Sequence, residues 1–249
     1  SIDNAATLAE VEDLYRPYKQ KRRTRATIAK EKGLEPLAAS LWEQGNGDPL
    51  EMAAAYVDEE KEVTTPEEAL NGALDILAEQ ISDDASLRRR LRVVAFAQAE
   101  LVAKAVDPEA ETVYKMYYDF RQPVRTIAGH RILAVNRGEK EEALKVFVEF
   151  DREKALSIVY SASVKQPCEE NACSEAVRQA AEDSYDRLIF PSLEREIRAS
   201  LTENASEAAI KVFSVNLRQL LMQPPVKGKT ALGLDPGYRT GCKVAVVDE

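Results

Sequence analysis

Residues 65–81 read TPEEALNGALDILAEQI and carry the clearest structural signal in the chain. Thr65 can cap a helix, Pro66 suits its first turn, and Glu68 can bond back to the cap. Apolar side chains then recur three or four residues apart, at Leu70, Leu74, Leu77 and Ile81. This pattern predicts a capped helix with one buried face, and a buried face requires neighbouring elements to cover it.

Segments on both sides of this helix show similar patterns. Residues 48–51, Asp-Pro-Leu-Glu, have the form of another helix N-terminus, and helical spacing of apolar residues recurs as far as Leu221. Strands are indicated near residues 142–150 and at residues 230–235 and 243–247. So little β structure cannot cover the helices, which must therefore pack on one another. We expect a mainly α fold, an elongated multi-helix scaffold with a short β element near residues 142–150 and a C-terminal β-hairpin.

Caps and helix breakers predict further boundaries. Ser82 is expected to cap a helix that continues to about residue 107. Gly138 is expected to interrupt the helical pattern before the first predicted strand, for which the sequence identifies no partner. Pro191 is expected to end or kink the helix that precedes it. Residues 88–92, Arg-Arg-Arg-Leu-Arg, place charges around a helix axis and indicate a solvated face.

The C-terminal segment predicts a different kind of structure. Residues 230–235 and 243–247 indicate two strands, and Pro236-Gly237 a turn after the first of them. A two-stranded hairpin is marginally stable by itself, so we expect it to be the least ordered part of the chain. Asp235 ends the first strand. One interpretation of it is a turn-forming Asp-Pro-Gly, and the other is a metal-binding carboxylate.

The composition restricts the classes of function. Charged residues make up 31% and the net charge is −9, which argues against a basic face that binds nucleic acid along the whole chain. Aromatic residues make up only 6%, so no broad surface for base stacking is expected. No apolar run is long enough to span a membrane, and the first residues do not resemble a signal peptide.

Residue types that commonly bind metals are scarce. The cysteines are Cys168, Cys173 and Cys242, and His130 is the single histidine. Neither their number nor their spacing suits a zinc site or a disulfide framework, and so few cysteines suit a reducing cytosol. We expect a cytoplasmic protein with no metal ion, no cofactor and no membrane partner.

One local region departs from the acidic character of the chain. Residues 16–32 contain eight Lys or Arg and one acid, Glu31, so they carry +7 while the remainder carries −16. Tyr15 and Tyr18 accompany these cations, a mixture that suits phosphate contacts with some stacking. The candidate nucleic-acid contacts are Lys19, Lys21, Arg22, Arg23 and Arg25. The alternative is that these cations pair with acidic helices of the same chain.

Several stretches together resemble a known family. They are DLYRPYK at 13–19, KRRTRA at 21–26, KGLEPLA at 32–38, HR at 130–131 with RGEK at 137–140, FPSLERE at 190–196, NLRQLL at 216–221 and LGLDPGYRTGCK at 232–243. In this order, and over nearly the whole chain, they are similar to the bacterial Tex family of transcription accessory proteins.

The resemblance implies a modular protein. Tex family members have an N-terminal helical region, a YqgF-type RNase H-like domain, helix-hairpin-helix modules and a C-terminal OB-fold RNA-binding domain. Residues 1–225 would then correspond to the helical region, incomplete at its start, and residues 226–249 to the first hairpin of a truncated RNase H-like domain. In RNase H-like nucleases several carboxylates hold two metal ions, so Asp235 would be catalytic only if the full-length domain is a nuclease.

Three hypotheses about function follow. The leading one is a noncatalytic helical scaffold from a transcription accessory protein that binds RNA or DNA mainly through modules missing here. The first alternative is an inactive piece of an RNase H-like nuclease. The second is a protein-interaction module that docks on the transcription machinery. We expect no enzymatic activity from the chain itself, and so assign it no catalytic residue.

Overall fold

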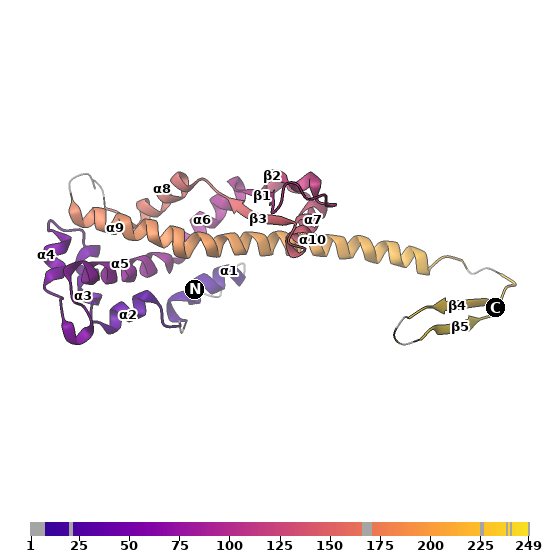
Figure 1. Ribbon diagram of the computed structural model, residues 1–249, viewed down its shortest axis with the longest axis horizontal. Coiled ribbons are helices and arrows are strands. Elements are labelled where there is room, and N and C mark those ends of the chain that lie inside the picture. Colours follow the sequence, from indigo (N-terminus) through magenta and orange to yellow (C-terminus); the bar gives the residue numbers. More distant parts are fainter. Residues whose placement is uncertain are drawn as a thin grey trace. The chain divides into compact units, whose positions relative to one another are not determined.

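A computed structural model describes residues 8–19, 22–165, 171–224, 227–237, 239 and 241–248. The fold is mainly α, as predicted (Figure 1). The α-helices are α1 (Leu8–Tyr15), α2 (Arg25–Glu31), α3 (Glu35–Trp42), α4 (Pro49–Ala54), α5 (Pro66–Ser82), α6 (Ala85–Gln98), α7 (Gly129–Lys140), α8 (Arg152–Ser163), α9 (Ala172–Asp183) and α10 (Phe190–Leu221). The strands are β1 (Glu100–Ala105), β2 (Asp119–Pro123), β3 (Leu144–Glu149), β4 (Ala231–Asp235) and β5 (Lys243–Val247).

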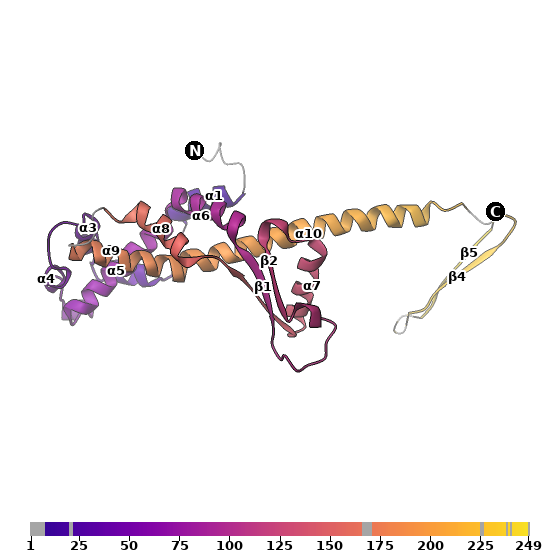
Figure 2. The ribbon, with the colours of Figure 1, turned by 90° about the horizontal axis from the view of Figure 1, so that it is seen from above.

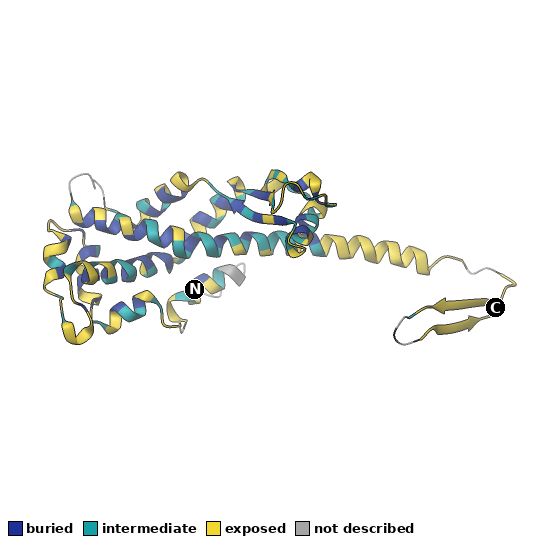
Figure 3. Ribbon diagram, viewed as in Figure 1, coloured by how far each residue is buried: buried dark blue, intermediate teal, exposed yellow. Residues whose placement is uncertain are grey.

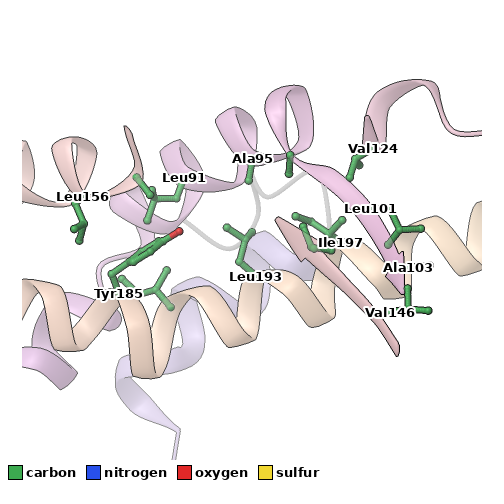
Figure 4. Close-up of a cluster of buried hydrophobic side chains, with 14 of the residues drawn as sticks. Leu91, Ala95, Leu101, Ala103, Val124, Val146, Leu156, Tyr185, Leu193 and Ile197 are labelled. Atoms are coloured by element: carbon green, nitrogen blue, oxygen red, sulfur yellow. The ribbon is translucent and has the colours of Figure 1, made fainter. Parts of the chain in front are cut away.

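The chain divides into two compact units, Ser1–Ala205 and Ser206–Glu249. The first contains two hydrophobic cores. One lies among α2, α3, α4, α5 and α9, and the other is enclosed by α6, the sheet of β1, β2 and β3, α8 and the first half of α10 (Figures 3 and 4). The predicted domains, residues 1–225 and 226–249, stay a prediction.

The predicted cap of α5 is confirmed. The hydroxyl of Thr65 accepts a hydrogen bond from the backbone N–H of Glu68 at 3.2 Å, and the Glu68 carboxylate accepts one from the N–H of Thr64 at 2.8 Å. These bonds satisfy backbone donors that a helix start leaves free. The predicted cap of α6 is wrong. Ser82 ends α5, and Asp84 caps α6 by accepting bonds from the second and third residues after it.

The partner of the first predicted strand is β1, which sequence reasoning assigned to a helix. The helix α6 ends at Gln98 and is followed by β1 (Figure 2). β1 is the central strand of an antiparallel sheet in the order β2-β1-β3. Within β1 the side chains of Leu101, Val102 and Ala103 are all buried. Three consecutive buried residues hide the alternation that marks a half-buried strand, so the helical periodicity of α6 extends falsely into β1.

Neither Gly138 nor Pro191 ends a helix, for different reasons. Gly138 lies inside α7, where a β-carbon would come within 2.6 Å of Leu144 Cδ1, so this glycine lets α7 approach β3 closely. Pro191 is the second residue of α10 and follows a π-helical turn, Ser184–Ile189, that continues directly from α9. There the N–H of Phe190 bonds to the carbonyl of Tyr185, five residues earlier, where an α-helix would use the carbonyl four residues earlier. This wider turn accommodates Pro191, which has no backbone N–H to donate.

The second unit contains the end of α10 and the predicted hairpin. Strands β4 and β5 pair antiparallel, with Leu232 opposite Val246 and Gly233 opposite Ala245. Every residue of both strands is exposed, and so are the residues of α10 from Glu207 to Leu221 (Figure 3). None of the described helices combines the length and the apolar character needed to cross a membrane.

Candidate nucleic-acid interface

The basic strip, residues 15–25, connects α1 to α2. It begins with a short 3₁₀ turn, Arg16–Tyr18, and leads to Thr24, whose hydroxyl caps α2 by accepting a bond from the N–H of Thr27. The predicted contacts Lys19, Arg22, Arg23 and Arg25 are all exposed, and Lys21 lies outside the described residues. The described part of the strip therefore presents cations to solvent.

Two tyrosines of the strip are also accessible. Tyr15 is 51% exposed and Tyr18 is 81% exposed, so each ring has a face available for stacking on a base. Cations and aromatic rings thus occur together here, as contact with a single strand requires.

The alternative interpretation, internal pairing, holds for part of the strip. Arg23 lies 3.1 Å from Glu31, but both side chains are more than half exposed, so this ion pair adds little stability. Arg25 is close enough to Asp75 for its charge to act on that carboxyl. Burial raises the pKa of Asp75, while the charges of Arg187 and Arg25 act to lower it. Within the described residues, Lys19 and Arg22 have no acidic group at ion-pair distance.

A polar network fixes the start of the strip. Arg16 points toward α10, where its Nη2 atom donates to Ser192 Oγ at 3.4 Å, and partial burial together with the nearby charge of Arg88 lowers the pKa of Arg16. Asp13, which is buried, accepts hydrogen bonds from Arg88 Nε at 2.6 Å and from Arg92. Arg88 Nη2 also donates to Ser192 Oγ at 3.0 Å.

This network corrects the expected solvated face at residues 88–92 for Arg88 and Arg92, whereas Arg89 and Arg90 are exposed as expected. Arg88 and Arg92 face inward, and only 4% and 14% of their side-chain surfaces are exposed. Arg92 also bonds both carboxylate oxygens of Glu196 on α10. Charge periodicity within α6 could not reveal this, because Asp13 and Glu196 lie far away in the sequence.

The described side chains of α1 belong to neither hydrophobic core. Val11 and Leu14 are half-buried, whereas Asp13 is buried within the ion pairs described above. Ion pairs and hydrogen bonds to α6 therefore make a large contribution to keeping α1 packed against α6. The position of the adjoining strip consequently depends on them.

A cavity of about 760 Å³ lies beside the strip. Its lining includes Lys19, Lys30 and Ile76, together with the four acidic residues Glu35, Glu79, Asp83 and Asp84. A polyanion would be repelled by this excess of carboxylates. Lys19, one of the candidate contacts, therefore lies beside an acidic cavity that disfavours a polyanion.

Of the other candidate positions, the structure describes Cys173, Cys242, His130 and Asp235. Cys173 is buried, and burial raises the pKa of its thiol, whereas Cys242 is exposed and Cys168 lies outside the described residues. His130 is exposed at the second residue of α7. Asp235 ends β4 opposite Lys243. In the described ranges, no three His, Cys, Asp or Glu side chains gather as a metal site would require.

Comparison with known proteins identifies the family. Residues 44–213 match the family described as Tex central region-like. The chain belongs to the Tex family. It is 48% identical to the uncharacterized protein YdcI of Bacillus subtilis over its full length, and 38% identical to the transcriptional accessory protein Tex of Neisseria gonorrhoeae, also over its full length.

A more distant Tex relative is the human S1 RNA-binding domain-containing protein 1. It is 32% identical over 98% of this chain. The chain covers 35% of the Bacillus protein, 33% of the Neisseria protein and 26% of the human protein. It therefore spans about a third or less of the length of these Tex relatives.

Proposed function

We propose that this chain is a noncatalytic helical scaffold within a transcription accessory protein that binds nucleic acid. Its own contacts to RNA or DNA are made by the basic strip, through Lys19, Lys21, Arg22, Arg23 and Arg25. The names of its relatives, a transcriptional accessory protein and an S1 RNA-binding domain-containing protein, support this role. The observation that carries it is the exposure of Tyr18 beside cations that face solvent.

The expected binding is weak and independent of sequence. Cations on a short connecting segment can meet phosphates, but no helix of the strip presents side chains suited to reading base edges. We expect a Kd on the order of 10⁻⁴ to 10⁻⁶ M at physiological salt. Affinity should fall as salt rises, because each neutralised phosphate releases condensed counterions.

Replacing Arg22, Arg23 and Arg25 together with alanine should weaken binding at least about tenfold at low salt. It should also flatten the salt dependence of binding by about one unit of slope for each phosphate that is no longer neutralised. Fluorescence anisotropy with labelled single-stranded RNA and DNA measures both quantities.

A matched control replaces three exposed arginines elsewhere, Arg125, Arg137 and Arg195, so that the net charge changes equally. Equal losses in the two triple variants would show that only net charge matters and would reject the strip as the contact site. No binding by the unaltered chain at low salt, together with a lower melting temperature of the strip variant, would favour internal pairing instead.

We also propose that the chain has no nuclease activity. Two-metal phosphoryl transfer needs several carboxylates that converge on the metals, and Asp235 is the single residue of such a set that the sequence suggests. Incubation of labelled RNA and DNA with Mg²⁺ or Mn²⁺ should leave both substrates intact. Metal-dependent cleavage that disappears in Asp235→Ala would overturn this proposal.

A further inference from the structure

The strand β3 lies at one edge of its sheet, since the strand order is β2-β1-β3. An edge strand presents backbone N–H and C=O groups that can pair with another chain. The N–H of Val106 donates to the carbonyl of Ala143 at 3.1 Å, which sets the hydrogen-bond register between β1 and β3. In this register the backbone N–H and C=O groups of the odd-numbered residues of β3 point toward β1. The backbone groups of Val146 and Val148 therefore point away from β1, along the edge.

Two side chains of α10 form hydrogen bonds with these backbone groups of β3. The N–H of Val148 donates to Glu194 Oε1 at 2.8 Å, and Arg198 Nη1 donates to the carbonyl of Val146 at 3.1 Å. Glu194 and Arg198 are four residues apart and so lie on one face of α10. Together they supply the acceptor and the donor that a neighbouring strand would supply.

Arg198 is held in this position from a second helix. Its guanidinium also bonds the Glu139 carboxylate, at 2.9 Å to Oε1, and Asn136 Oδ1 at 3.2 Å, both from α7. Asn136 in turn donates to the Thr202 hydroxyl of α10 at 2.9 Å. Because several bonds fix the guanidinium, its contact with the strand is preorganised.

The groove beside β3 and the sequence of β3 would both allow another strand to pair with this edge. A groove of about 760 Å³ runs beside it and is lined in part by Phe147, Arg195 and Glu203. The sequence of β3, LKVFVE, contains four apolar residues, two of them β-branched, and no proline. Short segments of this kind readily pair with copies of themselves when their edges are open.

The opposite edge is protected by ordinary means. Val124 donates to the carbonyl of Ala99 at 2.9 Å, so the N–H of Arg121 in β2 points outward, where the described residues offer it no acceptor. β2 is short, ends in Pro123 and carries Asp119 and Arg121, all of which disfavour strand addition. β3 also carries two charges, on Lys145 and Glu149, but it is one residue longer than β2 and contains no proline.

We propose that Glu194 and Arg198 act as a substitute for a fourth strand and close the β3 edge against pairing with a second copy of this chain. This clamp is independent of nucleic-acid binding. Helix α10 thus supports the sheet and also prevents it from extending between molecules.

The double variant Glu194→Ala/Arg198→Ala tests the clamp. Its dimerisation, measured by sedimentation velocity over a range of concentrations, should be at least tenfold tighter than that of the unaltered chain. The control is Arg195→Ala/Glu203→Ala, which changes the same charges in the same groove and leaves the strand contacts in place. A folded double variant that dimerises no more than this control overturns the proposal.

Hydrogen exchange of the unaltered chain gives a second test that does not depend on a variant folding. After correction for intrinsic rates, the amide of Val148 should exchange at least tenfold more slowly than the outward amide of Arg121 at the other edge. Adding Glu194→Gln, which keeps an acceptor oxygen, should preserve most of this protection. Equal exchange at Val148 and Arg121 in the unaltered chain would show that the edge is open and the clamp absent.

Discussion

Replacing Asp13 with asparagine is expected to lower the free energy of unfolding by about 3–5 kcal/mol, the range for removing one partner of a buried ion pair. The substitution keeps the shape of the side chain but leaves Arg88 without its buried carboxylate partner. The Nη1 atoms of Arg88 and Arg92 are already buried without a hydrogen-bond partner among the described residues, so the guanidinium groups have little local compensation. Urea denaturation followed by circular dichroism measures the change.

Detachment of α1 would limit this loss, because both arginines would then regain water. In that case the amides of residues 10–19 should exchange faster while those of α5 remain protected. The comparison variant is Arg89→Ala, whose side chain is 72% exposed and lies 3.5 Å from Glu10. It should change stability by no more than about 1 kcal/mol. If Asp13→Asn costs no more than Arg89→Ala and leaves exchange unchanged, the network does not hold α1.

Local chemistry predicted the elements whose stabilising contacts are close in sequence. The cap at Thr65, with Glu68 three residues later, marks the start of α5, and the alternation around Val146 marks β3. In both cases a short pattern has one favourable structure. The hairpin of β4 and β5 was recognised for the same reason.

Tertiary contacts decided the elements that were predicted wrongly. Gly138 lies inside α7, where it leaves room for Leu144, and Pro191 lies inside a helical stretch that contains a π turn. Neither circumstance is visible in the few residues on which a helix-breaker rule depends. β1 was not predicted because its sequence does not alternate between apolar and polar residues. Val102 is buried like its neighbours, since both faces of the strand are covered there.

The candidate site shows the same division. Exposure of Lys19, Arg22, Arg23 and Arg25 was predictable, since a dense run of cations is costly to bury. The inward turn of Arg16 was not, because its acceptor, Ser192, is 176 residues away in the sequence. Sequence patterns thus identified the charged segment but not the network that positions it.

Replacing Ile197 with alanine is expected to lower the free energy of unfolding by about 2–5 kcal/mol, the range for large-to-small changes in a core. Ile197 is fully buried in the core that Leu193 of α10 shares with Leu101 of β1 (Figure 4). The loss combines the transfer energy of three carbon atoms with a cavity that a core built on a sheet and several helices cannot close. Chemical denaturation with an unchanged m-value would show that native stability, and not the compactness of the unfolded chain, has changed.

The matched control for Ile197 is Ile210→Ala on the same helix. It removes the same atoms and makes the same change in helix propensity, but Ile210 is 66% exposed. Its expected effect is within about 0.5 kcal/mol of zero, since little buried surface is lost and alanine favours the helix slightly. The difference between the two variants therefore isolates the packing of the first half of α10. A cost at Ile210 equal to that at Ile197 would mean that the apolar side chains beyond Ala205 are covered in solution, which would contradict their exposure in this structure.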